Sequence, residues 1–361
     1  MVNEQMKLYT SETWIRDLDE EIANLPELKL LSDKRILITG ATGLICSAVV
    51  DLLIRYNETM NSQISILVAG RSIDKLKNRF FPYSSKSYMK CVYFDATTIK
   101  DDSDLEADYI IHGASNASPN KIILEPVETM MSNLLGLKRL LDQAKNHNSR
   151  RLLFVSSSEV YGKKENNRPF NENEYGYIDL LNSRNSYSVG KRAAETLCAS
   201  YYDEYDVDYV IIRPGHIYGP TAGETDNRVS SSWAFAAARG EDIIMKSDGA
   251  QVRSYCYCLD CANAILKVLL DGECGKAYNV SNPESVISIK EMAQLLSESA
   301  GVKLIYVMPT ESEKKGFNPM LNSSLDASSL INLGWHGLFN AEKGFIHTIK
   351  VIKESTESGN M

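Results

Sequence analysis

The 361-residue sequence lacks the features that mark membrane, secreted and nucleic-acid-binding proteins. No apolar run reaches the roughly 20 residues that a membrane helix needs, and the polar, charged N-terminus does not resemble a secretory signal. The formal net charge is −8 and no basic stripe is present, whereas binding to nucleic-acid phosphates needs a basic face. We therefore expect a cytoplasmic protein that binds neither membranes nor nucleic acid.

The seven cysteines do not form a recognisable framework either. Their number is odd, and their spacing does not match a small disulfide scaffold. Cys256, Cys258 and Cys261 lie close together, but no second cysteine pair or histidine pair accompanies them, so a four-ligand zinc site lacks its ligands. We expect no metal site, and we expect these three thiols to pack in the interior.

The chain does contain a regular alternation of short apolar runs and amphipathic stretches, which predict strands and helices respectively. Strands are predicted at 35–39, 64–68, 90–94, 109–112, 152–156 and 208–213, and helices at 47–56, 73–80, 127–145 and 187–205. Strands and helices that alternate at these lengths imply an α/β protein with a Rossmann-type, doubly wound parallel sheet and helices on both faces.

The pattern divides the chain into three regions. Residues 1–32 predict an N-terminal helical extension with one helix around 11–25, and residues 33–213 predict an NAD(P)-binding Rossmann domain. The remainder is irregular, with helices expected at 231–239, 261–270 and 289–300 and short strands near 243, 255 and 278. Residues 214–361 therefore predict mostly a smaller C-terminal α/β substrate-binding lobe, with segments that return to the main sheet.

The turn after the first strand, Thr39-Gly-Ala-Thr-Gly-Leu-Ile-Cys-Ser47, indicates a dinucleotide site. Gly40 and Gly43 permit a tight turn and let backbone amides approach a pyrophosphate at the helix N-terminus. The predicted cofactor contacts in this loop are Gly40, Thr42, Gly43, Leu44 and Ile45. The third position of the glycine pattern is Cys46, so we expect a slightly displaced helix and retained but weaker binding.

The second strand leaves NAD and NADP undecided. An acidic residue at its end holds the ribose hydroxyls of NAD, whereas an arginine accommodates the 2′-phosphate of NADP. Residues 69–72 contain no acid but include Arg71, which favours NADP. Asp95, after the third strand, is expected to meet the adenine edge. Redox-neutral chemistry, considered below, favours NAD instead.

The catalytic prediction rests on Tyr187 and Lys191, which lie on one helix face at positions i and i+4. A nearby ammonium favours the phenolate, so Tyr187 is expected to titrate closer to neutrality than a free phenol and to take a proton from a substrate hydroxyl. The motif Ser156-Ser-Ser-Glu-Val-Tyr-Gly162 ends the fifth strand, where open α/β sheets bind ligands. It brings hydroxyls and the carboxylate of Glu159 to the same place.

These motifs, taken in order, resemble the extended short-chain dehydrogenase/reductase superfamily, in its nucleotide-sugar epimerase/dehydratase branch. The resemblance runs from about Lys34 to Trp335. It rests on TGATGLI at 39–45, HGAS at 112–115, Asn133 with Gly136, SSSEVYG at 156–162, the Tyr187/Lys191 pair, RPGHIYGP at 213–220, VRSYCYCLD at 252–260 and LDASSLINLGW at 325–335.

The resemblance implies roles residue by residue. Ser157 is then the hydroxyl that contacts the sugar 4-hydroxyl, Tyr187 the base, and Lys191 its electrostatic partner, which also holds the nicotinamide ribose. Ala114 and Pro214 are implied at the cofactor. The substrate-side residues implied are Ser158, Asn133, His216, Arg228 and Arg253, of which the two arginines match positions that contact the nucleotide diphosphate.

The residues beside Ser157 divide the branch. The 4,6-dehydratases carry Asp-Glu where this chain has Ser158-Glu159, so their proton donor is missing. Nucleotide-sugar decarboxylases carry Ser-Glu, and the stretch 112–129 resembles theirs, but an arginine of their C-terminal segment is replaced here near Asn322. Simple C4 epimerases usually lack the glutamate. Glu159 is therefore expected to act as a second acid/base that removes an acidified proton from a 4-keto sugar.

The favoured hypothesis is a redox-neutral epimerase or dehydratase-like enzyme acting on a nucleotide-diphosphate sugar through transient C4 oxidation. Three alternatives stay open: a nucleotide-sugar decarboxylase, an NADPH-dependent 4-keto-sugar reductase, and a non-catalytic dinucleotide-binding sensor. The resemblance also implies a homodimer through the helical surfaces at 134–144 and 187–202.

Overall fold

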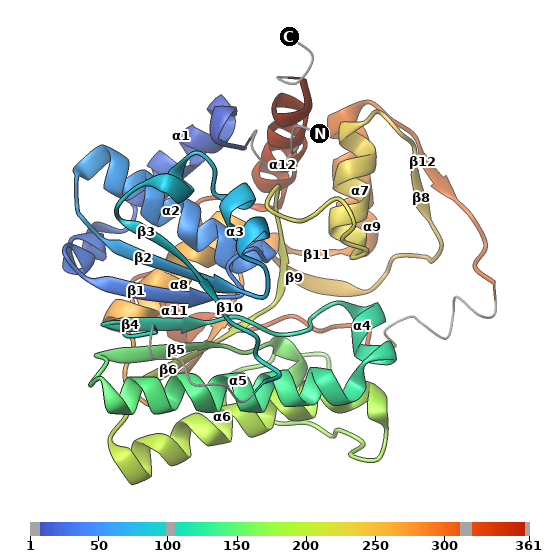
Figure 1. The fold of residues 1–361 in the computed structure, drawn as a ribbon. Coiled ribbons are helices and arrows are strands. Elements are labelled where there is room, and N and C mark those ends of the chain that lie inside the picture. The colour runs from blue at the N-terminus through green and yellow to red at the C-terminus, as the bar shows by residue number, and fades with distance from the viewer. Residues whose placement is uncertain (1–7, 99–104, 311–319, 358–361) are drawn as a thin grey trace.

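One parallel sheet forms the centre of the fold. In the computed structural model, which describes residues 8–98, 105–310 and 320–357, this sheet has seven strands in the order β10-β6-β5-β4-β1-β2-β3 (Figure 1). The strands are β1 (Arg35–Thr39), β2 (Ser65–Gly70), β3 (Met89–Tyr93), β4 (Tyr109–His112), β5 (Arg151–Val155), β6 (Tyr209–Pro214) and β10 (Ala277–Val280). Every pairing is parallel, which confirms the predicted fold class.

Helices cover both faces of this sheet, and alternate strand residues point to each layer. Leu37 and Phe154 pack with α5 (Pro126–Asn146) and α6 (Ser186–Tyr205), which lie side by side on one face (Figure 1). Ile36 and Leu153 face the opposite layer, where α2 (Leu44–Met60) packs against α8 (Cys258–Asp271). Because both faces are buried, the strands are apolar almost throughout rather than alternating. A short helix, α3 (Ile73–Arg79), links β2 to β3.

The chain beyond β6 builds two smaller sheets beside the main one. β7 (His216–Tyr218), β9 (Val252–Tyr257) and β11 (Val286–Ser288) form the first, and β8 (Ile243–Met245) pairs with β12 (Leu304–Tyr306) in the second. β10 belongs to this part of the chain, yet it pairs with β6 at the edge of the main sheet. Further helices in the described ranges are α4 (Pro119–Leu124), α7 (Val229–Ala238), α9 (Ile289–Ala300), α11 (Ser328–Asn332) and α12 (Ala341–Glu357).

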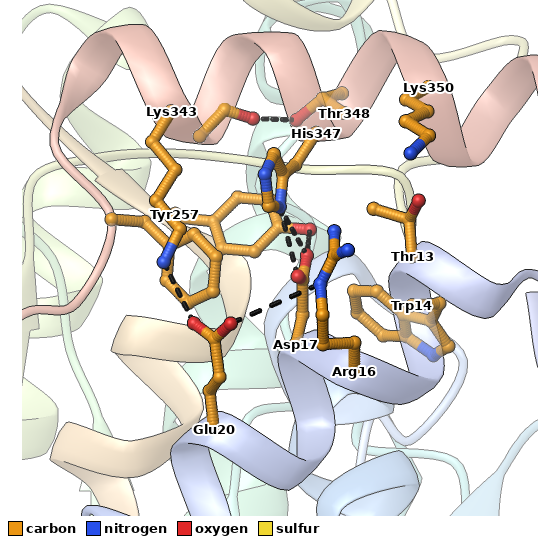
Figure 2. A network of polar contacts seen from close by, with 12 residues as sticks. Thr13, Trp14, Arg16, Asp17, Glu20, Tyr257, Lys343, His347, Thr348 and Lys350 are labelled. Atoms are coloured by element: carbon orange, nitrogen blue, oxygen red, sulfur yellow. Dashed lines mark hydrogen bonds and ion pairs between the residues drawn. The ribbon is translucent and has the colours of Figure 1, made fainter.

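The N-terminal extension forms α1 (Glu12–Ala23), close to the helix expected around 11–25, and the Ser11 side chain caps it. Figure 2 shows how α1 joins α12 and the end of β9. Asp17, which is fully buried, pairs with His347 Nδ1 at 2.9 Å and accepts a hydrogen bond from Tyr257 at 3.2 Å. Lys343 of α12 pairs with Glu20 at 2.8 Å. The extension therefore ties the C-terminal helix to the core.

Two expected absences concern metals and membranes. Cys256, Cys258 and Cys261 are all buried at the junction of β9 and α8, as the packing prediction requires. Within the described ranges, no group of His, Cys, Asp or Glu is arranged to hold a metal ion. None of the helices in those ranges combines the length and the apolar character that a membrane crossing requires.

Candidate active site

The glycine loop sits directly at the N-terminus of α2. Gly40 adopts a φ of +68°, and a Cβ there would lie 2.8 Å from the backbone of Gly113 and Ala114, so only glycine fits. Gly43 is the N-cap, so α2 begins at Leu44, three residues earlier than predicted. Thr42 and Gly43 are exposed. The first helical turn leaves its N–H groups without partners inside the helix, which suits an anionic pyrophosphate.

Cys46 has room because Gly113, the residue that faces it at the end of β4, has no side chain. The thiol is buried, and a Cβ placed on Gly113 would lie 2.3 Å from its Sγ atom. Gly113 therefore supplies room next to the helix at the position where a third glycine would otherwise supply it. Burial raises the pKa of Cys46 to about 12, although the Lys191 charge opposes this, so the thiol is neutral.

The residues expected at the ribose and adenine lie at the ends of β2 and β3. Arg71 is exposed. Asp95 is half-buried, and its carboxylate accepts from the Thr97 backbone N–H at 2.9 Å and hydroxyl at 2.8 Å. Partial burial works to raise the pKa of Asp95, but these two bonds and the Arg71 charge outweigh it, so the pKa is lowered. Arg71 thus has an anionic neighbour within the protein.

The two other predicted cofactor residues border the glycine loop and the end of β6. Ala114 donates its N–H to Thr39 Oγ1 at 3.4 Å, and the same hydroxyl contacts His112 Nδ1 at 2.7 Å. Burial, with the Lys191 charge, lowers the pKa of His112 to about 3, so this ring is neutral. Pro214 is the last residue of β6 and is buried.

Lys191 lies on α6 with its amine against the end of β5. Its Nζ donates to the Val155 carbonyl at 2.7 Å and sits 4.5 Å from the Phe154 ring centroid and 5.7 Å from that of Tyr187. Burial lowers the pKa of Lys191 to about 7, with the charge of Glu195 as the main opposing influence. The pKa of this amine therefore lies far below that of an ordinary lysine.

Tyr187 does not behave as the sequence predicted. The phenol is buried, and burial followed by the Glu159 charge raises its pKa, while contact with Ser157 and the Arg228 charge act in the opposite direction. The expectation that Lys191 brings Tyr187 towards neutrality is wrong for the protein alone, because burial and the Glu159 charge outweigh Ser157 and Arg228, and Lys191 is not among the influences that lower this pKa. The structure nevertheless brings Ser157, Tyr187 and Glu159 together.

Glu159 and Ser158 follow β5 in a short 3-10 turn capped by Ser157. The Ser157 hydroxyl accepts from the Glu159 N–H at 3.2 Å. Glu159 is exposed, and its carboxylate accepts from the Ser188 hydroxyl at 3.0 Å. Ser188 is the residue after Tyr187 and was not singled out from the sequence. This bond holds the carboxylate beside the tyrosine, and Ser158 is half-buried in the same turn.

The residues expected to bind the substrate divide into two groups. Arg228 and Arg253 lie close enough to His216 for their charges to act on it. Burial, together with these two charges, lowers the pKa of His216 to about 4. Arg253 is only 4% exposed and donates to the Val252 and Met320 carbonyls at 2.9 and 3.1 Å. Among the described residues no carboxylate pairs with it, so a buried cation is left for an anionic ligand.

Arg228 and Asn133 are more constrained. Arg228 is bound by both carboxylate oxygens of Asp226, so a ligand would have to compete with that pair. Asn133 is completely buried between α5 and α6, where its amide donates to the Thr129 carbonyl at 2.8 Å. Its Oδ1 has no hydrogen-bond partner among the described residues. Its position is that of a structural residue behind the site.

A nicotinamide dinucleotide fits the residues present. Gly40 is in a conformation and a space that exclude any side chain, and the first turn of α2 offers free N–H groups. Lys191 and Tyr187 lie at the carboxyl end of the parallel strands, where open α/β sheets bind their ligands. His112 and Cys46, which are buried near Lys191, are both neutral.

Comparisons with known proteins agree with this geometry. A model of the NAD dependent epimerase/dehydratase family matches residues 36–281. UDP-glucuronic acid decarboxylase 1 of Xenopus tropicalis is 28% identical over 96% of this chain and 81% of its own length. UDP-glucuronic acid decarboxylase 5 of Arabidopsis thaliana is 30% identical over 79% and 81%, respectively.

Solved structures show the same fold at lower identity. The UDP-glucose 4-epimerase of Thermotoga maritima has a TM-score of 0.72 at 22% identity and covers 89% of this chain and 99% of its own. The dTDP-glucose 4,6-dehydratase of Bacillus anthracis, solved in complex with NAD, has a TM-score of 0.72 at 20% identity and covers 90% and 97%.

Proposed function

The chain belongs to the NAD-dependent epimerase/dehydratase family and is an enzyme, and we propose that it modifies a nucleotide-diphosphate sugar through transient oxidation at C4. The observation that carries this proposal is the convergence of Ser157, Tyr187, Lys191 and Glu159 at the carboxyl ends of β5 and its neighbours. Family membership adds support, because the two relatives described above are named UDP-glucuronic acid decarboxylases, and UDP-glucuronic acid is a UDP-sugar.

In this proposal the chain's own residues orient the sugar and move its protons. Ser157 accepts or donates at the C4 hydroxyl. Tyr187 would take the hydroxyl proton as the phenolate, so the positive charge of the bound nicotinamide, with Lys191 and Arg228, would have to offset the burial that raises its pKa in the protein alone. A bound nicotinamide ring would supply the acceptor for the C4 hydride. Arg253 holds the diphosphate, which provides the anion that a buried guanidinium lacks in the protein alone. His216, being neutral, can either donate or accept at the sugar.

Glu159 is proposed to decide the product. Once C4 is a ketone, the protons at C3 and C5 become acidic, and a carboxylate beside Tyr187 can remove one of them. Glu159 is exposed and anchored by Ser188, so it remains accessible to a substrate atom. Its removal should therefore leave C4 oxidation in place and abolish the subsequent step.

Decarboxylation of a nucleotide-linked uronate is the second candidate, and the named relatives favour it. A 4-keto uronate is a β-keto acid, so it loses CO₂ once C4 is oxidised. Asn322, near where the decarboxylases carry an arginine, already has partners in the protein: its amide donates to the Asn167 carbonyl at 2.8 Å and accepts from the Ser324 N–H at 2.8 Å. The substrate carboxylate would have to find its cation elsewhere. Lys163 and Lys164 line a pocket that includes Asn322.

The cofactor is proposed to be NAD. The family description is NAD-dependent, and a cycle in which hydride returns to the sugar needs no external reductant. Arg71, the one feature that favours NADP, acts on Asp95, and this carboxylate would repel a 2′-phosphate placed between the two side chains.

The test of the function uses a panel of UDP-, GDP-, CDP- and dTDP-sugars, with UDP-glucuronate included, followed by mass spectrometry. Tyr187→Phe should lower turnover at least 1,000-fold, roughly 4 kcal/mol of activation free energy, with NAD affinity unchanged, because only the proton acceptor is lost. Glu159→Gln should let a 4-keto species accumulate without product.

Ser188→Ala is the matched control, since it frees the Glu159 carboxylate without removing it and should cost far less than Glu159→Gln. Full activity of Tyr187→Phe would contradict the assignment of the base. Normal product from Glu159→Gln would favour decarboxylation or simple C4 epimerisation over proton abstraction by this carboxylate.

A further inference from the structure

Glu195 lies on the same face of α6 as the catalytic pair. It follows Lys191 by four residues, as Lys191 follows Tyr187, so all three side chains line one stripe of the helix. Glu195 is 8% exposed. A carboxylate this deeply buried needs several hydrogen-bond donors to be stable.

Three donors satisfy it, and they come from the two strands that end at the site. Ser156 Oγ donates to Glu195 Oε1 at 2.5 Å, and Arg213 donates from Nε at 3.0 Å and from Nη2 at 2.6 Å. Ser156 follows β5 and precedes Ser157, whereas Arg213 lies in β6 and precedes Pro214. One carboxylate therefore joins α6 to the ends of β5 and β6.

Arg213 extends the connection around the back of the site. Its Nη1 donates to the Tyr161 hydroxyl at 3.1 Å and to the Glu172 carbonyl at 2.8 Å, and its Nη2 donates to the Tyr175 hydroxyl at 2.7 Å. Tyr161 in turn donates to Asn279 Oδ1 at 2.5 Å, in β10. Because Arg213 is saturated with partners inside the protein, its function is to hold this network and not to meet a ligand.

We propose that Glu195 is a positioning residue that fixes α6 against β5 and β6 and keeps the Lys191 amine a charged hydrogen-bond donor beside Tyr187. The link to catalysis rests on the proposed function, whereas the electrostatic link to Lys191 does not. The hydrogen bonds of Glu195 come from Ser156 and Arg213 and not from Ser157 or Tyr187. It therefore acts on the reaction through Lys191 and through Ser156, the residue next to Ser157.

The charges around Lys191 show why one carboxylate matters. On α6 the amine faces Glu195, Cys198 and Tyr187; Cys46 reaches it from α2 and His112 from β4. Cys46, Cys198 and His112 are neutral, because burial raises the pKa of both thiols and lowers that of the imidazole.

Glu195 is thus the anion that opposes the desolvation of Lys191, and its own ion-pair partner is Arg213, at 2.6 Å. A lysine whose pKa is about 7 loses its charge as pH rises through neutrality. Removing Glu195 moves that loss to lower pH.

The experiment measures the titration of Lys191 directly in the whole protein, without substrate, by NMR of lysines labelled at Cε; Lys191→Arg identifies the signal by its disappearance. In Glu195→Gln the proton affinity of Lys191 should fall about tenfold. Ser156→Ala removes a donor but keeps the carboxylate, so the titration should barely move. Glu195→Gln/Arg213→Met contains neither buried charge. In this double variant the proton affinity of Lys191 should rise again above its value in Glu195→Gln.

An unchanged Lys191 titration in Glu195→Gln would overturn the electrostatic half of the proposal. If Glu195→Gln does not fold, the double variant and Glu195→Asp provide the same comparison: Glu195→Asp should titrate like the wild type, and a tenfold loss there would contradict the charge argument. When activity is available, the alkaline limb of the pH profile of kcat should shift with the Lys191 titration. A protein without nucleotide-sugar activity would still give the NMR result.

Discussion

At the residue scale, Cys46 and Gly113 together provide the close helix–strand packing that a dinucleotide loop usually obtains from its third glycine. The thiol fills the space between α2 and the end of β4, and the bare backbone of Gly113 makes that possible. The sequence showed the departure at Cys46 but not its compensation, because Gly113 is 67 positions further along the chain.

Gly113→Ala should therefore weaken both the fold and NAD binding. The added Cβ would lie 2.3 Å from the Cys46 Sγ, while its next neighbours, at 3.4 and 3.7 Å, are tolerable. Overpacking of this kind costs about 1–3 kcal/mol. Calorimetric NAD titration and thermal unfolding measure the effect.

Cys46→Ala/Gly113→Ala is the informative companion, since it removes only the clashing sulfur. It should recover most of the stability and affinity lost in Gly113→Ala, and Cys46→Ala alone should bind NAD at least as well as the wild type. A double variant as damaged as Gly113→Ala would show that Gly113 is needed for its backbone conformation and not for the thiol.

The residues of the candidate site differ in how far the sequence could identify them. Tyr187 and Lys191 share a helix face at a spacing that is readable from the chain. Glu195 repeats the same spacing and could have been found in that way, but its partners Ser156 and Arg213 come from separate strands. Burial reverses the expected shift of Tyr187, and no local pattern reports how deeply a side chain is buried.

At the scale of elements, α1 is more than a lead-in to the Rossmann fold. Its buried face brings Asp17 to Tyr257 and His347, and Glu21 to Asp260 of α8 (Figure 2 shows the Asp17 side). Asp260 accepts from the backbone N–H groups of Leu338 and Phe339. The extension therefore fastens α8 and α12 around the core.

Glu21 makes the stability of the contact between α1 and α8 depend on pH. Burial, followed by the Asp260 charge, raises the pKa of Glu21 well above its ordinary 4.5. The native state thus holds a proton that the unfolded state releases above that ordinary value, so its stabilising effect is complete at acid pH and is lost as pH rises towards the native pKa.

Glu21→Gln should consequently raise the melting temperature by a few kelvin at pH 8, on the order of 1 kcal/mol, and change it little at pH 5. Differential scanning calorimetry at the two pH values measures this. Glu20→Gln, at a partly exposed neighbour on the same helix, is the control and should show no such dependence. Equal destabilisation by Glu21→Gln at both pH values would mean that the carboxylate is needed in its charged form.

The predicted elements agree with the structure where periodicity is strong and local. The strands of the main sheet appear within two residues of their predicted ends, because buried parallel strands form short apolar runs. α4, α11, α12, β7, β11 and β12 were missed. The short strands owe their conformation to pairing with distant segments. The apolar face of α12 packs against α7, α9 and α1, which only the tertiary fold brings near.

At the scale of the whole molecule, the two halves of the chain share the main sheet. β10 pairs with β6, and Arg213 and Asn279 connect those strands through Tyr161. We propose that 33–213 carries the cofactor and the catalytic pair while 214–361 mostly binds the sugar nucleotide. We also propose a homodimer through α5 and α6, where Tyr202 is 44% exposed; sedimentation should give twice 40.3 kDa, and a single-chain mass would contradict it.

The most direct test of the central claim follows hydride at the sugar's C4. A nucleotide sugar labelled with deuterium at C4, first identified as a substrate in the panel above, is incubated with the NAD-loaded protein and with Tyr187→Phe. Our account predicts deuterated NADH on the enzyme during turnover and return of the label to the product, with neither event in Tyr187→Phe. Product formed with the C4 deuterium never passing to the nicotinamide would contradict it.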